Sequence, residues 1–126
     1  MKKVFVSMPM MEKTYRTINS IQNAILTAIE EHPEVSDELQ VIETYPLYKE
    51  YVNGNLSGIE HMCERLKLLS KADYIAFWEG WENVQRCHLE HAYAEIFSIP
   101  CFYLEEDKDE NVQRKYHSGL CSHLWR

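Results

Sequence analysis

The sequence predicts an α/β fold in which a small, open parallel sheet of four to five strands carries helices on both faces. Short apolar segments at residues 3–8, 39–44, 74–78 and 99–104 alternate with longer segments whose apolar residues recur at helical spacing. The segment 74–78 is an unbroken run rich in aromatic residues, as a strand covered on both faces requires. Such alternation produces parallel strands with right-handed crossovers, an architecture of the flavodoxin or Rossmann type.

Length and composition limit the class of protein. A chain of 126 residues with 45% apolar residues forms one globular domain, residues 1–126. The net charge of −7 argues against a nucleic-acid polymer as partner, because a phosphate backbone needs a basic face. A small anionic ligand remains compatible with this charge. We find no membrane span, signal peptide or paired cysteine spacing, and we therefore expect a cytoplasmic protein.

The first half of the chain contains two strands and one helix. We expect the strand 3–8 at the centre of the sheet, and Pro9 ends it. A helix is expected over residues 13–31, where His32-Pro33 stops it. Its expected buried residues are Tyr15, Ile18, Ile21, Ile25 and Ile29. The second strand is 39–44.

Residues 45–55 are predicted to form a long loop. This segment carries three tyrosines, Tyr45, Tyr48 and Tyr51. Long loops with aromatic side chains are often functional, so Tyr48 and its neighbours are candidates for a lid over a ligand. A tyrosine-rich dimer contact is an equal alternative.

The second half repeats the strand–helix pattern. A helix starts at about Gly58, because Ser57 and Glu60 have the spacing of a capping box. Its expected buried residues are Ile59, Met62, Cys63, Leu66 and Leu69. After the strand 74–78, Gly80 opens a turn, and a further helix follows. The helical stripe expected to be buried there is Leu89, Ala92, Tyr93, Ile96 and Phe97. The last strand is 99–104, followed by a polar tail, 111–126.

The candidate functional residues follow the ends of the central strands. Ligands of open parallel sheets bind where the strands end and the next helices begin. The loop residues Ser7, Met8, Pro9 and Met10 follow the first strand. Glu90 lies in the first turns of a helix, where the partial positive charge of the helix N-terminus keeps a carboxylate ionised.

Three groups of residues resemble the small nucleoside 2-deoxyribosyltransferase-like proteins of bacteria and phages. Residues 4–10 (VFVSMPM) resemble the family's first strand and its Ser-x-Pro-Met loop. Ala72-Asp73 resembles the Ala-Asp step before an apolar strand. Residues 80–83 (GWEN) and 87–91 (CHLEH) resemble the family's Gly-Trp-Glu turn and the helix start that carries a Glu-His pair.

The resemblance implies a deoxyribosyltransferase or an N-glycosidase that acts on a deoxynucleoside or its monophosphate. In these enzymes a glutamate at this helix start attacks C1′ of the sugar, the base leaves, and water or another base resolves the glycosyl-enzyme. Glu90 matches this nucleophile. Glu79 or Glu82 is either the general acid or a solvated turn residue. We expect no cofactor and no metal, because Cys87 and His91 lack the second close ligand pair of a zinc site.

The turn after strand 74–78 supplies further candidates for substrate binding. Trp81 either stacks on the base or packs into the protein. Asn83 is either a turn residue or a ligand of the sugar or phosphate. Arg65 falls near the position where the family has a participating aspartate. Arg86 replaces the family's glycine before Cys87, and it either narrows the pocket or binds a ligand phosphate.

The absent aspartate near Arg65 and the arginine at position 86 leave a second interpretation open. The same pocket would then hold a nucleotide or a nucleotide-derived signal without turnover, in a sensor or sequestering protein. A third interpretation is a partner-binding protein whose tail, 111–126, docks on a neighbour. We expect a homo-oligomer in each case, because a small sheet leaves apolar surface to be covered.

Overall fold

A computed structural model describes residues 1–106 and the backbone of residues 114–116. The strands are β1 (Lys2–Ser7), β2 (Leu39–Val41), β3 (Tyr74–Trp78), β4 (Cys101–Glu106) and β5 (Arg114–Tyr116). The helices are α1 (Tyr15–Glu30), α2 (Tyr45–Val52), α3 (Gly58–Leu69) and α4 (Gln85–Ile96), with a 3-10 turn η1 (Trp81–Asn83) before α4. Apart from β5, the tail predicted at 111–126 lies outside the described residues. No helix in the described part of the chain is long and apolar enough to cross a membrane.

The five strands form one sheet in the order β2-β1-β3-β4-β5. The first four are parallel, which confirms the predicted open parallel sheet, and β5 pairs antiparallel with β4. Strand β1 is central, since Val4 is in register with Val41 of β2 and with Tyr74 of β3. The chain therefore leaves β1 towards one edge and returns towards the other. The crevice at the carboxyl ends of β1 and β3 is the usual ligand position in such sheets.

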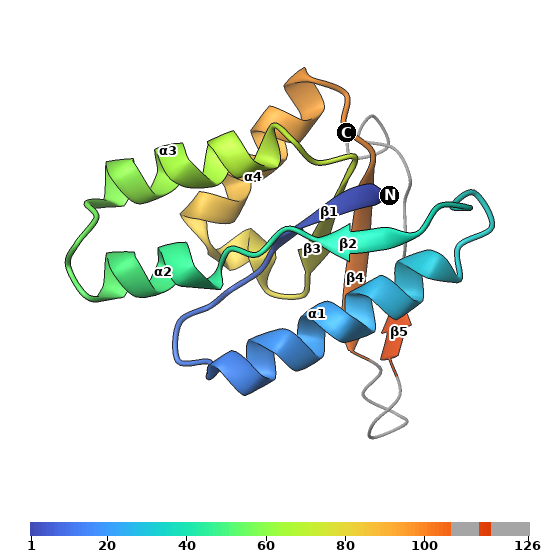
Figure 1. Ribbon diagram of the computed structural model, residues 1–126, viewed down its shortest axis with the longest axis horizontal. Coiled ribbons are helices and arrows are strands. Elements are labelled where there is room, and N and C mark those ends of the chain that lie inside the picture. Colours follow the sequence, from blue (N-terminus) through green and yellow to red (C-terminus); the bar gives the residue numbers. More distant parts are fainter. Residues whose placement is uncertain (107–113, 117–126) are drawn as a thin grey trace.

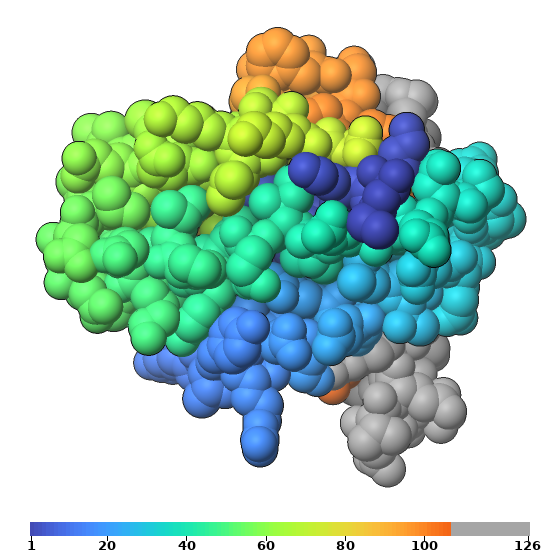
Figure 2. Space-filling view, in the orientation of Figure 1, coloured from blue at the N-terminus to red at the C-terminus, as the bar shows by residue number. Residues whose placement is uncertain are grey.

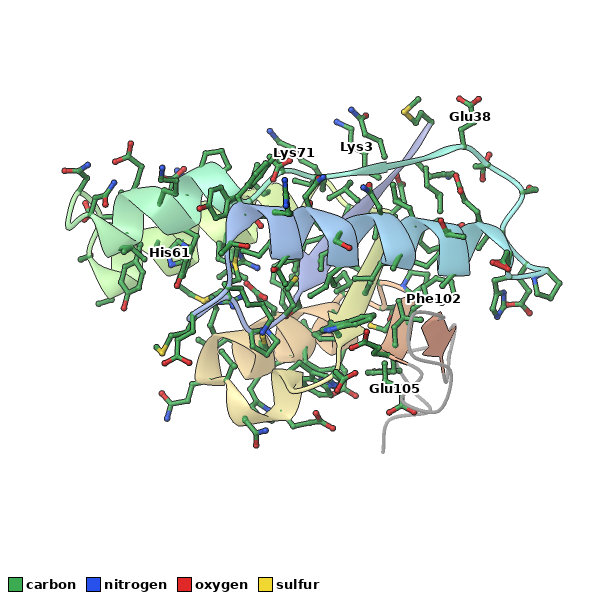
Figure 3. All side chains as sticks on the ribbon, turned by 90° about the horizontal axis from the view of Figure 1, so that it is seen from below. Lys3, Glu38, His61, Lys71, Phe102 and Glu105 are labelled. Carbon is green, nitrogen blue, oxygen red and sulfur yellow. The ribbon has the colours of Figure 1, made fainter. Side chains whose placement is uncertain are left out.

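Helices cover both faces of the sheet. Helix α1 lies on one face, and α3 and α4 lie on the other (Figure 1). Because side chains alternate along a strand, Val4 and Val6 of β1 face α1, whereas Phe5 faces α3 and α4. Figure 3 shows Phe102 of β4 between α1 and the sheet. Two separate cores thus hold the layers together.

Helix α1 buries the face that the sequence predicts. Thr14 is its N-cap and accepts a hydrogen bond from the backbone N–H of Thr17. The predicted isoleucines at positions 18, 21, 25 and 29 are all buried, whereas Tyr15 is about half exposed. Local periodicity was sufficient here, because every inward position except Gln22 is apolar.

The prediction of a loop over residues 45–55 is wrong, because Tyr45–Val52 forms α2. Pro46 stands in the first turn of this helix, where its missing N–H costs no hydrogen bond. No residue of α2 is buried. The helix packs beside α3 and lies on the molecular surface (Figures 1 and 2).

Two strands differ from their predicted bounds. Strand β2 ends at Val41, whereas the prediction was 39–44. Strand β4 begins and ends two residues later than the predicted 99–104.

The buried faces predicted for α3 and α4 are also wrong for most positions, although Leu69 is buried as predicted. Helix α3 buries His61, Arg65 and Leu69, while Ile59 is 78% exposed and Cys63 is exposed. The inward residues of α4 are Cys87, Glu90, His91 and Ala94. Its predicted stripe points outward, with Leu89, Ile96 and Phe97 all more than half exposed. Polar side chains can take the inward positions because Arg65 of α3 forms an ion pair with Glu90 of α4.

Candidate functional site

Glu90 lies near the start of α4 and is completely buried. Both of its carboxylate oxygens accept hydrogen bonds. The hydroxyl of Ser7, at the end of β1, donates to Oε1 over 2.7 Å. Arg65 Nε donates to Oε2 over 2.5 Å, and Arg86 Nη1 donates to Oε1 over 3.2 Å. The carboxylate is therefore held by side chains from three elements of the fold, β1, α3 and α4.

Arg65 is the residue of this site that sequence reasoning did not assign to it. Its side chain, on α3, is completely buried and makes a two-pronged pair with Glu90, in which Nη2 also reaches Oε1 at 3.3 Å. The guanidinium lies over the ring of Phe5, 4.9 Å from its centroid. Nη2 also donates to the carbonyl of Val6 over 3.4 Å. The departure from the family's aspartate is the only sequence signal that singles Arg65 out.

Arg86 closes the site from the first turn of α4. Its Nη2 donates to the carbonyl of Met8 over 2.7 Å, while its Nη1 contacts Glu90 one helical turn away. The side chain is 16% exposed. Ser7, Arg65, Arg86 and Glu90 are called the Glu90 cluster below. Removing one member of such a buried ionic group leaves the others uncompensated.

His61 lies one helical turn before Arg65 on the buried stripe of α3. Its ring stacks on Tyr51 of α2, with centroids 4.8 Å apart and planes at 14°, and lies 6.4 Å from the ring of Tyr48. Burial and, after it, the positive charges of Arg65 and Arg86 lower the pKa of His61 to about 4, although the charge of Glu90 raises it. Nε2 is buried without a hydrogen-bond partner among the described residues.

Cys87 and His91 are both buried in the protein interior. Burial raises the pKa of the Cys87 thiol, which disfavours the thiolate needed for metal binding or attack. His91 contacts the hydroxyl of Tyr103 at 2.9 Å, and burial lowers its pKa. Within the described residues, no three His, Cys, Asp or Glu side chains are grouped to hold a metal ion.

An open cavity of about 620 Å³ lies at the carboxyl edge of the sheet, on the face that carries α1. Lys13 and Arg16, at the start of α1, line it together with Pro9, Trp78 and Glu79. Gly80 completes this wall with φ +90°, and a Cβ placed there would lie only 3.1 Å from the Pro9 ring. A glycine is therefore required for the turn after β3 to approach the loop after β1.

A smaller cavity of about 180 Å³ lies next to it, on the other side of the turn. Trp81, Glu79, Glu82 and Tyr103 are among its lining residues. Trp81 is 3% exposed and packs against Phe77, with ring centroids 4.8 Å apart, so most of its surface serves the core. Glu79 accepts a hydrogen bond from the backbone N–H of Glu106 over 2.7 Å.

The structure brings only some of the predicted site residues together. Ser7, Arg86 and Glu90 are in direct contact, and Met8 joins them through its carbonyl. The side chains of Met8 and Met10 are buried in the core beneath α1. The other candidates lie apart from this group: Pro9, Glu79, Trp81 and Glu82 line the two cavities, Tyr48 lies on α2, and Asn83 is exposed in η1. Glu90 lines neither cavity.

No protein-family model and no curated protein matches this chain significantly. The resemblance to the deoxyribosyltransferase-like family therefore depends on the motif residues alone, and it stays a prediction.

Proposed function

We propose that this protein binds a nucleoside or nucleotide in the large cavity and does not cleave it through Glu90. The observation that carries the proposal is the separation of the Glu90 carboxylate from the large cavity. A nucleophilic carboxylate has to reach C1′ of its substrate, but Glu90 is completely buried and lines neither cavity. Arg65, Arg86 and Ser7 already occupy its oxygens.

The cavity has the position and size for such a ligand, and its lining combines Lys13 and Arg16 with Glu79 and Glu106. It lies beside the ends of β1 and β3, and its volume falls in the usual range for small-molecule sites, roughly 300–1,000 Å³. Lys13 and Arg16 stand at the start of α1, whose first turn contains no acidic residue, so a phosphate is favoured there. Trp78 and Pro9 offer apolar surface to a base, and Glu79 offers an acceptor to sugar hydroxyls.

The test is to incubate the protein with deoxynucleosides and their monophosphates, record thermal unfolding and analyse the recovered ligand by chromatography. We expect a higher melting temperature with intact ligand, because a ligand of the folded state stabilises it by mass action. The double variant K13Q/R16Q should lose this stabilisation, and E90Q should keep it. Absence of any stabilisation would overturn the proposal.

A second candidate function is the N-glycosidase or deoxyribosyltransferase that the motif residues imply. The contact of Ser7, Arg86 and Glu90 at the carboxyl edge favours it. This activity requires Arg65 to release Glu90 and the cluster to open towards the substrate. Free base that appears with the wild-type protein and disappears with E90Q would establish this function in place of the first.

We also propose that the chain self-associates through the outer surfaces of α3 and α4. Ile59, Leu89, Ile96 and Phe97 are each more than half exposed on these helices. Figure 2 shows the end of α4, in orange, projecting from the top of the molecule. Ile96 and Phe97 adjoin at the end of α4, and contiguous exposed apolar side chains are typical of protein interfaces. Sedimentation should give an oligomer for the wild-type chain and a monomer for L89E/I96E, and a monomeric wild-type chain would contradict the proposal.

A further inference from the structure

The Glu90 cluster contains more positive than negative charge. Two guanidinium groups, those of Arg65 and Arg86, share one carboxylate. Arg65 and Glu90 are completely buried and Arg86 is 16% exposed. Charges removed from water need compensation by opposite charge and hydrogen bonds. Among its four members, the cluster is therefore one negative charge short.

His61 adds an unpaired polar atom next to this charge. Its side chain is 4% exposed, and the buried Nε2 makes no hydrogen bond with any described residue. It lies one helical turn from Arg65, and it experiences the charges of Arg65, Arg86 and Glu90. Buried polar atoms in native proteins almost always have a partner. An oxyanion here would satisfy both the missing charge and the missing hydrogen bond.

We propose that His61 and Arg86, together with the charge of Arg65, form a second binding site, which takes a phosphate group as the free anion or as a phosphomonoester. The imidazole donates from Nε2 to one phosphate oxygen. The guanidinium of Arg86 donates to another, in the charge-assisted geometry that arginine provides for phosphate. The anion compensates the excess positive charge of the cluster.

Helix α2 covers this site in the structure and is suited to open it. Its tyrosines Tyr48 and Tyr51 lie against His61, yet no residue of α2 is buried. Figure 3 shows His61 at the end of the molecule where α2 and α3 lie together, and Figure 2 shows α2 on the surface. Tyr45 and Tyr48 are only partly buried where they pack against the core beneath α1, and an element without fully buried residues opens more readily than a core helix. Gly54, with φ +85°, follows α2 directly and provides a position for the hinge.

This site is distinct from the cavity proposed to hold the nucleoside. The cavity is lined by Lys13 and Arg16 on the α1 face, whereas His61 and Arg65 belong to α3 on the opposite face. The inference therefore does not depend on the proposed function. Either proposal can fail while the other holds.

Calorimetric titration with inorganic phosphate tests the site. We compare the wild-type protein with H61F, which keeps a ring for stacking on Tyr51 but removes Nε2. The matched control is H88Q at an exposed histidine of α4. We expect H61F to bind phosphate roughly tenfold or more weakly, since a hydrogen bond to a charged group is lost, and H88Q to bind normally. K13Q/R16Q removes the charges of the other cavity, so the binding event that H61F weakens should persist in this variant.

A second measurement uses the native protein and does not depend on how a variant folds. The imidazole resonances of His61 should shift on addition of phosphate, and its pKa should rise from about 4, because an adjacent anion favours the imidazolium. Methyl phosphate then distinguishes the sources: tighter binding than phosphate indicates an ester, and weaker binding indicates the free anion. Absence of phosphate binding, equal binding by H61F, or loss of the phosphate-induced His61 shift in K13Q/R16Q would each overturn the inference.

Discussion

The two faces of the sheet are built in different ways. Beneath α1 the inward side chains are apolar except for Gln22, and Ile18 and Ile25 are completely buried. Beneath α3 and α4 the inward stripes carry His61, Arg65 and Glu90. Leu69 and Ala94 of these helices are buried, but Ile59, Leu89 and Ile96 point outward. One face therefore follows the hydrophobic periodicity of its helix, and the other opposes it.

This difference indicates that stability alone did not shape the α3–α4 face. Burial of apolar surface stabilises a fold by about 25 cal/mol per Å², which accounts for the α1 face. A buried ion pair seldom stabilises more than apolar side chains of similar volume. Clusters of buried ionisable groups are instead typical of functional sites. The Glu90 cluster lies at the carboxyl edge, where a parallel sheet binds its ligands.

Replacement of Arg65 should have the largest effect. R65L leaves the buried carboxylate of Glu90 without its main partner, and we expect a loss of about 3–5 kcal/mol in the free energy of unfolding, measured with urea. The control R16L, at an exposed arginine, should change stability little. The double variant R65L/E90L should recover much of the loss. A loss below about 1 kcal/mol for R65L would contradict a tightly paired cluster.

Truncation of an isoleucine should lower the free energy of unfolding on the α1 face but not on the outer surface of α4, with a smaller loss than R65L causes. I25A removes a completely buried side chain beneath α1, and we expect a loss of about 3 kcal/mol in chemical denaturation. I96A changes a residue that is 73% exposed, and its effect should stay within about 0.5 kcal/mol in dilute protein. Equal losses would show that the outer surface of α4 is covered, as self-association requires.

The pH dependence of stability should come partly from His61. Its pKa is about 4 in the folded protein and about 6.5 in the unfolded chain, so the unfolded chain takes up the proton first. Stability is therefore lost as the pH falls from about 6.5 to 4, and this histidine has no effect above that range. Arg65, Arg86 and Glu90 are the charged groups that act on it.

The comparison of H61F with the wild-type protein isolates this effect from that of other titrating groups. Urea unfolding at several values between pH 7.5 and pH 4.5 should give a shallower loss of stability for H61F. Parallel curves for the two proteins would mean that His61 titrates normally.

Variants of the open cavity should have the smallest effect on stability. K13Q/R16Q changes side chains near the surface, and unfolding free energy should stay within about 0.5 kcal/mol of the wild-type value. Nucleotide affinity, measured by calorimetry, should nevertheless fall by roughly tenfold or more, because a charge-assisted phosphate contact is lost. Unchanged affinity would place the ligand elsewhere.

Local patterns predicted those parts of the protein where neighbours in sequence act together. The strand 74–78 and the capping box at Ser57 have the predicted form. Helix α2 was missed because its tyrosines and Pro46 resemble a loop, and a proline in a first helical turn is compatible with either structure. Glu90, Ser7 and Arg86 were identified as candidates, but their mutual contact was not a property of any one segment.

The sequence by itself determined the alternation of the first four strands with α1, α3 and α4, and most of the buried face of α1, because short-range periodicity encodes them. Only the tertiary structure decided which stripes of α3 and α4 turn inward. Arg65 and Glu90 are 25 positions apart, and Ser7 and Glu90 are 83 apart. Their attraction acts only after both helices have docked on the same face of the sheet, where low dielectric strengthens the pairing and makes an unpaired charge costly.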